Sequence, residues 1–108
     1  MERTKLEIAE DHRYWYNWRK THRYELIKAQ EEQNGLCAIC RKPENNIRNR
    51  RIMGLHIDHD HTTMEFRGLL CLRCNTGLGQ FLEDPEILRA AATYLDNYYD
   101  SLRKRVVR

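Results

Sequence analysis

The sequence predicts a small α+β domain that is stapled by zinc. Two Cys-x-x-Cys pairs, Cys37/Cys40 and Cys71/Cys74, enclose segments that alternate like short strands, and segments of helical periodicity lie on either side. With 108 residues, of which 32% are charged, the chain buries only a limited apolar core. Domains of this size gain much from a structural metal, so the small core and the cysteine pairs support the same prediction.

Two helices are expected ahead of the first cysteine pair. Residues 5–20 carry acidic side chains early and basic and aromatic side chains late, an order that suits the helix dipole. A second helix is expected from Tyr24 to about Gln33, because Asn34 and Gly35 form a typical helix C-cap. Residues 1–33 therefore form a helical segment that leads into the cysteines.

Residues 34–82 are expected to form the zinc-bound core. The stretch 41–54 is polar and basic and ends in glycine, which predicts a loop. Residues 55–58 alternate like a short strand, and residues 66–70 are expected to pair with them antiparallel around a turn at 61–65.

A short helix is expected to follow this hairpin. It starts after Cys71, carries Cys74 and Asn75, and breaks near Gly77 or Gly79. A predicted structural ligand and a predicted catalytic residue are thus adjacent on one helix.

The last helix has a clear start. Asp84 is a favourable N-cap, Pro85 suits the first helical position and Glu86 suits the first turn. Apolar residues then recur at steps of three and four to about residue 103, which predicts an amphipathic packing helix followed by a basic tail. Residues 83–108 complete the chain, which is expected to be one domain over residues 1–108.

Composition narrows the class of protein. The net charge of +3 is mild and does not by itself predict a nucleic-acid partner. No stretch reads as a membrane span or a secretory signal, so we expect a cytoplasmic protein without a membrane partner. In that compartment Cys-x-x-Cys pairs favour zinc over disulfides, and neither pair lies in the βαβ pattern of a thioredoxin-like redox motif.

The predicted zinc ligands are Cys37, Cys40, Cys71 and Cys74. Zinc held by four thiolates is tetrahedral and closed, so it cannot activate water, and its role is structural. The stretch between the two pairs exceeds the ~15 to 20 residues of a minimal zinc ribbon. We therefore expect it to carry the functional residues.

The enclosed stretch, together with Asn75 directly after the second cysteine pair, offers the groups that phosphodiester hydrolysis requires. The reaction needs a base whose pKa lies near the working pH and a cation that neutralises developing charge. His59 supplies the base, while the Asp58 carboxylate and the Asn75 amide oxygen suit Mg²⁺ or Mn²⁺. Neighbours on a regular strand face opposite sides, so the strand must twist or end between Asp58 and His59.

The combined pattern resembles the phage recombination endonuclease VII family, whose members are ββα-metal nucleases, also called His-Me finger or HNH-type. The likeness rests on Cys37-x-x-Cys40, on Ile57–His61 and on Arg67–Asn75, and it extends from about Leu26 to Leu95. It implies a zinc-stapled ββα-metal core with flanking N-terminal and C-terminal helices. It also implies a phage gene product that acts in the host cytoplasm.

The resemblance implies a role for each site residue. The four cysteines bind structural zinc, Asp58 and Asn75 bind the catalytic Mg²⁺ or Mn²⁺, and His59 is the general base. His61 matches a family position that orients substrate or stabilises the leaving group. The implied activity is a DNA endonuclease that leaves a 5′-phosphate and a 3′-hydroxyl.

Two departures from the family pattern refine this expectation. Family members commonly have a glycine in the turn after the Asp-His-Asp-His run, whereas residues 62–65 contain none. The turn must therefore avoid positive φ or tolerate strain. The C-terminal extension of the junction-resolving members is not found in this chain, so nicking or double-strand cutting of duplex DNA is expected rather than junction resolution.

Four arginines are expected to contact the DNA backbone: Arg48, Arg50, Arg51 and Arg67. Arg67 has a second interpretation, as a tie between the hairpin and a carboxylate such as Asp60, which we expect to be structural. The alternative function from another class is a non-catalytic zinc module that binds nucleic acid or protein. That module would bind without turnover.

The N-terminal segment is unusually aromatic. Tyr14, Trp15, Tyr16 and Trp18 lie within five positions, and they could stack on DNA or pack against protein. Packing is the favoured interpretation, because aromatic residues at helical spacing more often pack. So much aromatic surface also suggests a homodimer built on the N-terminal helices.

Overall fold

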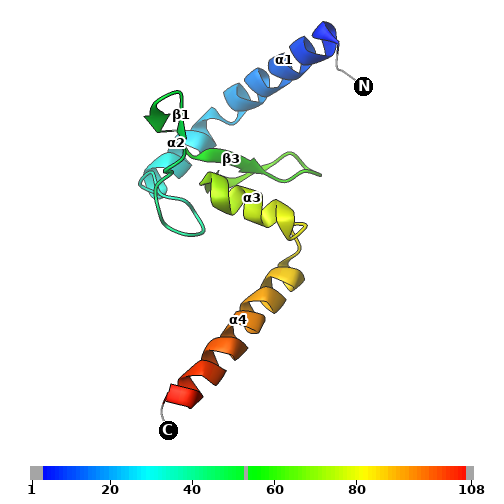
Figure 1. The fold of residues 1–108 in the computed structure, drawn as a ribbon. Coiled ribbons are helices and arrows are strands. Elements are labelled where there is room, and N and C mark those ends of the chain that lie inside the picture. Colours follow the sequence, from blue (N-terminus) through cyan, green and yellow to red (C-terminus); the bar gives the residue numbers. More distant parts are fainter. Residues whose placement is uncertain (1–3, 53, 107–108) are drawn as a thin grey trace. The chain divides into compact units, whose positions relative to one another are not determined.

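A computed structural model describes residues 4–52 and 54–106 (Figure 1). Four helices and two small sheets follow one another along the chain, which confirms the α+β class. The elements are α1 (Lys5–Thr21), α2 (Arg23–Glu32), β1 (Ile47–Arg48), β2 (Arg51–Ile52), β3 (His56–His59), β4 (Phe66–Leu70), α3 (Leu72–Gln80) and α4 (Pro85–Val106).

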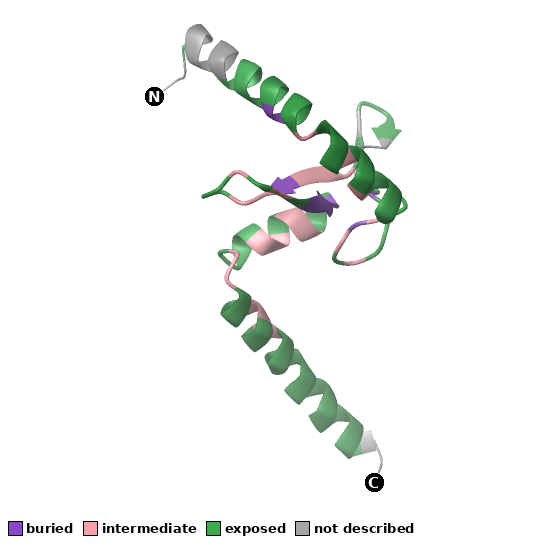
Figure 2. Cartoon of the chain, turned by 180° about the vertical axis from the view of Figure 1, so that it is seen from behind, coloured by how far each residue is buried: buried purple, intermediate pink, exposed green. Residues whose placement is uncertain are grey.

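The chain divides into two compact units, Met1–Cys74 and Asn75–Arg108. The first unit holds α1, α2 and both hairpins, and the boundary falls inside α3. Its buried residues gather on β3 and β4 and at Trp18 and Cys37, whereas α4 is largely exposed along its length (Figure 2). That the whole chain is one domain stays a prediction.

The central hairpin pairs β3 with β4 in the expected antiparallel register. His56 lies opposite Leu70 and Asp58 lies opposite Gly68, but His59 lies opposite Phe66. Between the pairs Asp58–Gly68 and His59–Phe66, β4 contains one additional residue, Arg67, which is the signature of a β-bulge. The additional residue belongs to β4, and it lies opposite the step from Asp58 to His59 in β3.

A side chain ties α2 to the outer edge of β4. The amide of Gln33 donates to the carbonyl of Leu69 at 2.9 Å, and its Oε1 accepts from the Leu69 N–H at 3.1 Å. Gln33 also donates to the carbonyl of Leu36 at 2.8 Å, and the Ala38 N–H donates to Leu69 at 3.1 Å. The edge of the hairpin is thereby closed by protein groups rather than left open.

The loop expected at residues 41–54 contains a second, two-residue hairpin. Ile47 pairs with Ile52 and Arg48 with Arg51 in antiparallel register. The two turn residues, Asn49 and Arg50, have φ of 52° and 63°, the conformation of a tight hairpin turn that usually favours glycine. The prediction of a loop missed this hairpin, because the turn uses Asn49 and Arg50 where glycine is the usual signal.

Helix α3 ends at Gln80, one residue beyond Gly79, as the expected break near Gly77 or Gly79 predicts. The helix ends where Leu82 and Glu83 adopt φ of 57° and 53°. The N–H groups of these two residues donate back to Gly79 and Leu78, at 3.0 and 2.8 Å, a left-handed C-terminal cap formed without glycine.

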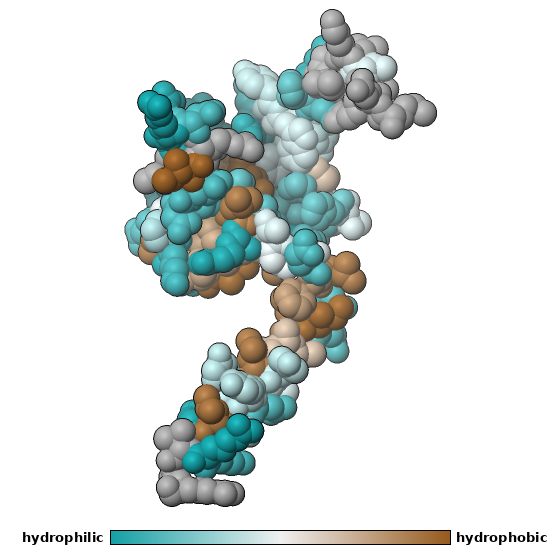
Figure 3. All heavy atoms as spheres, viewed as in Figure 1, coloured by the Kyte–Doolittle hydropathy of each residue, from teal (hydrophilic) through white to brown (hydrophobic). Residues whose placement is uncertain are grey.

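The start of α4 matches the prediction. The Asp84 carboxylate accepts from the Glu86 N–H at 2.9 Å, and its carbonyl accepts from the Leu88 N–H at 3.1 Å. The helix is longer than expected and ends at Val106, so the end of the predicted basic tail, residues 107–108, lies outside the described residues. Its apolar side chains recur along an otherwise polar surface (Figure 3), and several remain exposed, among them Leu95 and Tyr98.

Candidate metal centre and nuclease site

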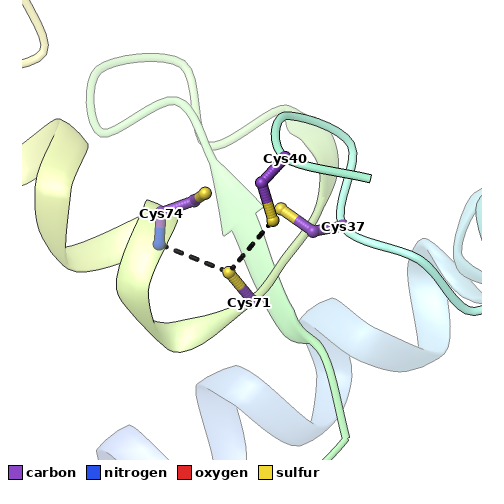
Figure 4. A group of neighbouring side chains, drawn as sticks. All are labelled: Cys37, Cys40, Cys71 and Cys74. Atoms are coloured by element: carbon purple, nitrogen blue, oxygen red, sulfur yellow. Dashed lines mark hydrogen bonds between the residues drawn. The ribbon is translucent and has the colours of Figure 1, made fainter. Parts of the chain in front are cut away.

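The two cysteine pairs converge on one point. The four Sγ atoms lie within 4.8 Å of one another, and the Sγ atoms of Cys40 and Cys71 are 3.8 Å apart. Figure 4 shows Cys37 and Cys40 on a tight turn facing Cys71 and Cys74 at the start of α3. None of the four forms a disulfide, and Cys37 is fully buried.

This geometry fits zinc. A tetrahedral zinc with Zn–S bonds of about 2.3 Å separates its sulfur ligands by roughly 3.8 Å. Backbone N–H groups also point at the sulfurs, since Ile39 donates to Cys37 and Cys74 donates to Cys71, each at 3.4 Å. Such outer contacts orient the ligands of a metal site. The cluster can therefore hold a structural zinc ion, as the spacing predicts.

The thiols of the cluster share their protons unequally. Burial opposes ionisation of Cys37, but backbone groups of Cys71, Cys40 and Ile39 outweigh it and lower its pKa to about 6. Burial, together with the neighbouring thiols, raises the pKa of Cys74 to about 12. A backbone hydrogen bond from Lys42 also lowers the pKa of Cys40, so ionisation is favoured on the first cysteine pair and opposed at Cys74. A bound cation is the group that stabilises all four thiolates together.

Asp58 and Arg67 form a bidentate ion pair in the hairpin. Arg67 Nε donates to Asp58 Oδ2 at 2.8 Å, and Arg67 Nη2 donates to Oδ1 at 2.9 Å. Asp58 is 8% exposed, so its charge is largely removed from water and needs a partner. The bulge explains the contact, because Arg67 is the extra residue of β4 and on a regular strand would face away from Asp58.

The sequence left open whether Arg67 meets DNA or ties the hairpin together. Arg67 is hydrogen-bonded to Asp58, and Asp60 has a role within the turn. Its Oδ1 accepts from the N–H groups of Thr62 and Thr63, both at 2.8 Å. These contacts, of which that of Thr63 is the stronger, lower the pKa of Asp60. Asp60 is thus the structural residue of the turn, as expected.

His59 ends β3 and is surrounded by aromatic rings. Its ring centroid lies 5.1 Å from Trp15, 6.1 Å from Trp18 and 4.9 Å from His61. Trp15 and Trp18 belong to α1, so the N-terminal helix packs on the tip of the hairpin. This confirms the packing interpretation for Trp18, which is 6% exposed, whereas Tyr16 on the same helix is 66% exposed.

The glycine-free turn uses a strained residue. Met64 has φ of 63°, and its carbonyl accepts from the indole N–H of Trp18 at 2.8 Å. Its N–H donates to the carbonyl of Asp60 at 2.8 Å. Of the two outcomes expected for this turn, the chain therefore tolerates strain rather than avoiding positive φ.

Asn75 follows Cys74 directly in α3 and is partly buried. It begins the second compact unit, whereas Asp58 and His59 belong to the first. A shared ion site for Asp58 and Asn75 stays a prediction.

The three loop arginines lie on the small hairpin. Arg50 lies in the turn and Arg51 at the start of β2, and both are exposed. Arg48 lies in β1, and the structure describes only its backbone. Their role at DNA stays a prediction.

Glu44 is a residue that the sequence did not single out. It is 8% exposed, and its carboxylate accepts from the N–H groups of Leu72 at 2.6 Å and Asn46 at 2.9 Å. These two contacts, in that order, lower the pKa of Glu44. The carboxylate thus caps the first turn of α3, beside Cys71. No local pattern signals such a cap, because Glu44 and Leu72 are far apart in the sequence.

Fold and site together define a small α+β protein with a four-cysteine metal knuckle and an Asp-His hairpin beside it. The sequence matches the family of recombination endonuclease VII over residues 9–97, and the chain belongs to that family. The resemblance found in the motifs is thereby confirmed, and membership indicates a nuclease.

Two phage proteins are similar to this chain. One is the Gene 59 protein of Mycobacterium phage D29, 44% identical over 66 residues, which are 60% of this chain and 37% of that protein. The other is the Gene 59 protein of Mycobacterium phage L5, 41% identical over 74 residues, 68% of this chain and 42% of that protein. The matched region thus spans about two fifths of each relative.

Proposed function

We propose that this protein is a metal-dependent DNA endonuclease that nicks or cuts duplex DNA. The observation that carries the proposal is the Asp58-His59 pair at the bulge of the central hairpin, within a chain of the endonuclease VII family. The register shift opposite these neighbours supports the proposal, because the pairing is irregular at the step where a regular strand would turn them apart. The core is proposed to be of the ββα-metal type, since β3, β4 and α3 succeed one another as strand, strand and helix.

In the proposed reaction, His59 takes a proton from the attacking water. His59 is the last residue of β3 and is half-buried. One side of its imidazole is therefore held by protein, while the other side can contact substrate. A positioned general base of this kind contributes about 10² to 10⁴ in rate. His61 is exposed, and its ring centroid lies 4.9 Å from that of His59, so it would act on the same substrate. The products would carry a 5′-phosphate and a 3′-hydroxyl.

Asp58 and Asn75 are proposed to hold a Mg²⁺ or Mn²⁺ ion, which when bound would neutralise charge on the phosphate. The donor set fits, because a buried carboxylate and an amide oxygen are hard ligands. Asp58 already holds a cation, the guanidinium of Arg67. Binding the ion therefore requires Arg67 to share or release the carboxylate. A released Arg67 would be available to a DNA phosphate, as would Arg48, Arg50 and Arg51.

A nicking assay on supercoiled plasmid tests this function. We expect cleavage with added Mg²⁺ or Mn²⁺ and a loss of about 10²-fold or more in His59→Ala. His12→Ala, an exposed histidine of α1, is the matched control and should cleave normally. Cleavage by His59→Ala at the wild-type rate, or without a divalent ion, would refute the mechanism. DNA binding without any cleavage would favour the alternative, a non-catalytic zinc module.

We also propose an assembly state and a location for the protein. Tyr14 and Tyr16 leave aromatic surface exposed on α1, 47% and 66% respectively, which supports a homodimer through the N-terminal helices. Sedimentation at micromolar concentration tests the homodimer, and a 13.1 kDa monomer would exclude it.

The phage relatives support action in the host cytoplasm. Among the described residues, no helix has the length and apolar composition needed to cross a membrane.

A further inference from the structure

We propose that Trp15 and Trp18 of α1 are positioning residues that hold the imidazole of His59 in place for proton transfer. The inference rests on the proposed nuclease function and adds the N-terminal helix to the elements that build the site. Neither the cysteine pairs nor the hairpin pattern points to this helix.

Trp18 anchors α1 to the hairpin tip. The side chain is 6% exposed, and its indole N–H donates to the Met64 carbonyl at 2.8 Å across the turn. On its other side the indole stacks on His22, with ring centroids 4.0 Å apart and planes at 17°. The His22 ring nitrogen Nδ1 lies 2.8 Å from the Trp18 carbonyl. Trp18 is thus fixed at both its polar and its apolar ends.

Trp15 extends this anchor to His59. Its ring meets Trp18 edge-on, with centroids 5.9 Å apart, and lies 5.1 Å from the His59 ring at an angle of 58°. Trp15 is 36% exposed, so it borders solvent on the side away from the anchor. The two indoles and His61 together leave the His59 ring few orientations.

A general base needs such support at this position. His59 ends a strand next to a turn, and the torsion that rotates an imidazole ring is soft. Each rotation would move the proton-accepting nitrogen away from the attacking water. Catalytic groups misplaced by about 1 Å can cost 10²-fold in rate. Aromatic neighbours restrict the ring through ring contacts rather than through hydrogen bonds to its nitrogens.

The alternative for Trp15 is stacking on a DNA base. Stacking would appear in substrate binding, whereas positioning appears in the rate of the bound complex. Steady-state kinetics of nicking therefore separate the two roles. Trp15 is the informative residue to replace, because loss of the buried Trp18 is expected to disorder the whole turn.

The experiment compares Trp15→Leu, Trp15→Phe and wild type, each loaded with zinc and assayed with Mg²⁺. For Trp15→Leu we expect kcat to fall by about 10- to 100-fold, with KM within about twofold. Trp15→Phe restores a ring against His59 and should recover most of kcat. His12→Ala, at an exposed position of the same helix, is the control for general effects on α1.

A second measurement does not depend on turnover. Ring currents of Trp15 and Trp18 displace the His59 Cε1–H resonance from its random-coil position, and His59→Ala identifies that resonance. In Trp15→Leu it should move back toward the random-coil position, while the other described histidines change little. An unchanged resonance would overturn the contact itself.

The outcomes separate this inference from the function on which it rests. A wild-type protein that cuts no DNA contradicts the proposed function and this inference with it. An active wild type whose Trp15→Leu variant keeps its kcat contradicts the positioning role alone. A raised KM with unchanged kcat assigns Trp15 to DNA stacking instead.

Discussion

At the scale of single residues, the β3–β4 turn concentrates backbone strain at Met64. A residue with a Cβ in the left-handed region costs about 1 to 2 kcal/mol, and Met64 has φ of 63°. Its carbonyl and N–H are both engaged, with Trp18 and Asp60. These two backbone hydrogen bonds therefore hold Met64 in the left-handed conformation, which its side chain does not favour.

Replacing Met64 should reveal the strain directly. Both Met64→Gly and Met64→Ala remove the side chain, but only glycine relieves the backbone, so the glycine variant should be more stable by about 1 kcal/mol. At Thr63, which has no positive φ, the order should reverse. Urea unfolding of the four zinc-loaded variants measures both differences. Equal stability of the two Met64 variants would show that the turn is not strained.

Arg67 leads to a second prediction at this scale, which concerns metal affinity. The guanidinium occupies both oxygens of Asp58, so it competes with the proposed ion. Unit charges about 4 Å apart repel by about 1 kcal/mol even at the dielectric constant of water. We therefore expect Arg67→Gln to bind Mn²⁺ at least about fivefold more tightly, as free Mn²⁺ measured by electron paramagnetic resonance would report.

Two variants control this measurement. Arg67→Lys retains the positive charge and should keep the wild-type affinity more closely than Arg67→Gln does. Asp58→Asn should weaken Mn²⁺ binding. If none of the three variants changes the affinity, the ion does not bind at Asp58.

At the scale of elements, the first turn of α3 depends on a carboxylate from outside the helix. Glu44 accepts the Leu72 N–H at 2.6 Å, where the helix dipole also favours negative charge. The pKa of Glu44 in the folded protein lies below its ordinary value of 4.5. The group therefore stabilises the fold above pH 4.5, and this contribution is lost as the pH falls through the lowered pKa.

Glu44→Gln tests this contribution. The variant loses the charge and should be less stable than wild type at neutral pH, and the difference should narrow as the pH falls below 4.5. Urea unfolding of both proteins across this range gives the difference at each pH. Glu31→Gln on the exposed surface of α2 is the matched control. A Glu44→Gln difference independent of pH would contradict the role of the carboxylate.

How far the sequence predicts each element depends on how local its signal is. The β3–β4 pairing and the α4 start are set by neighbouring residues, namely strand alternation and the Asp84-Pro85 cap, and both were predicted. The β1–β2 hairpin was not, because Asn49 and Arg50 adopt the left-handed conformations that glycine normally signals. Propensity is a weak guide where tertiary context decides.

The site follows the same rule. The cysteine cluster was predicted because Cys-x-x-Cys spacing itself imposes convergence on a metal. The Asp58–Arg67 pair was not predicted. A regular hairpin places these side chains on opposite faces, and the alternation of residues in the strands does not indicate the bulge. The contact of α1 with His59 joins residues more than forty positions apart. Such contacts have no local signature.

At the scale of the whole molecule, the cysteine cluster joins segments of the first unit that are far apart in the sequence. Cys37 and Cys40 follow α2, whereas Cys71 lies between β4 and α3 and Cys74 lies in the first turn of α3. The described core outside the cysteines consists of little more than Trp18, Leu69 and Leu70. A core so small cannot offset the conformational entropy of the chain without a staple. Zinc is therefore expected to hold the fold itself, and through it the nuclease site.

Removing zinc should consequently abolish activity by unfolding the protein rather than by emptying a catalytic site. After treatment with a chelator and addition of excess Mg²⁺, we expect disordered amide resonances and no nicking, and added Zn²⁺ should restore both. Cys40→Ala should behave like the chelated protein, while Ile39→Ala, an exposed residue of the same turn, should fold and cut normally. Metal analysis should find one zinc per chain. If the zinc-free protein keeps its amide spectrum and cuts DNA with Mg²⁺ alone, the cysteine cluster is dispensable, and the fold must be held by contacts other than those of the metal.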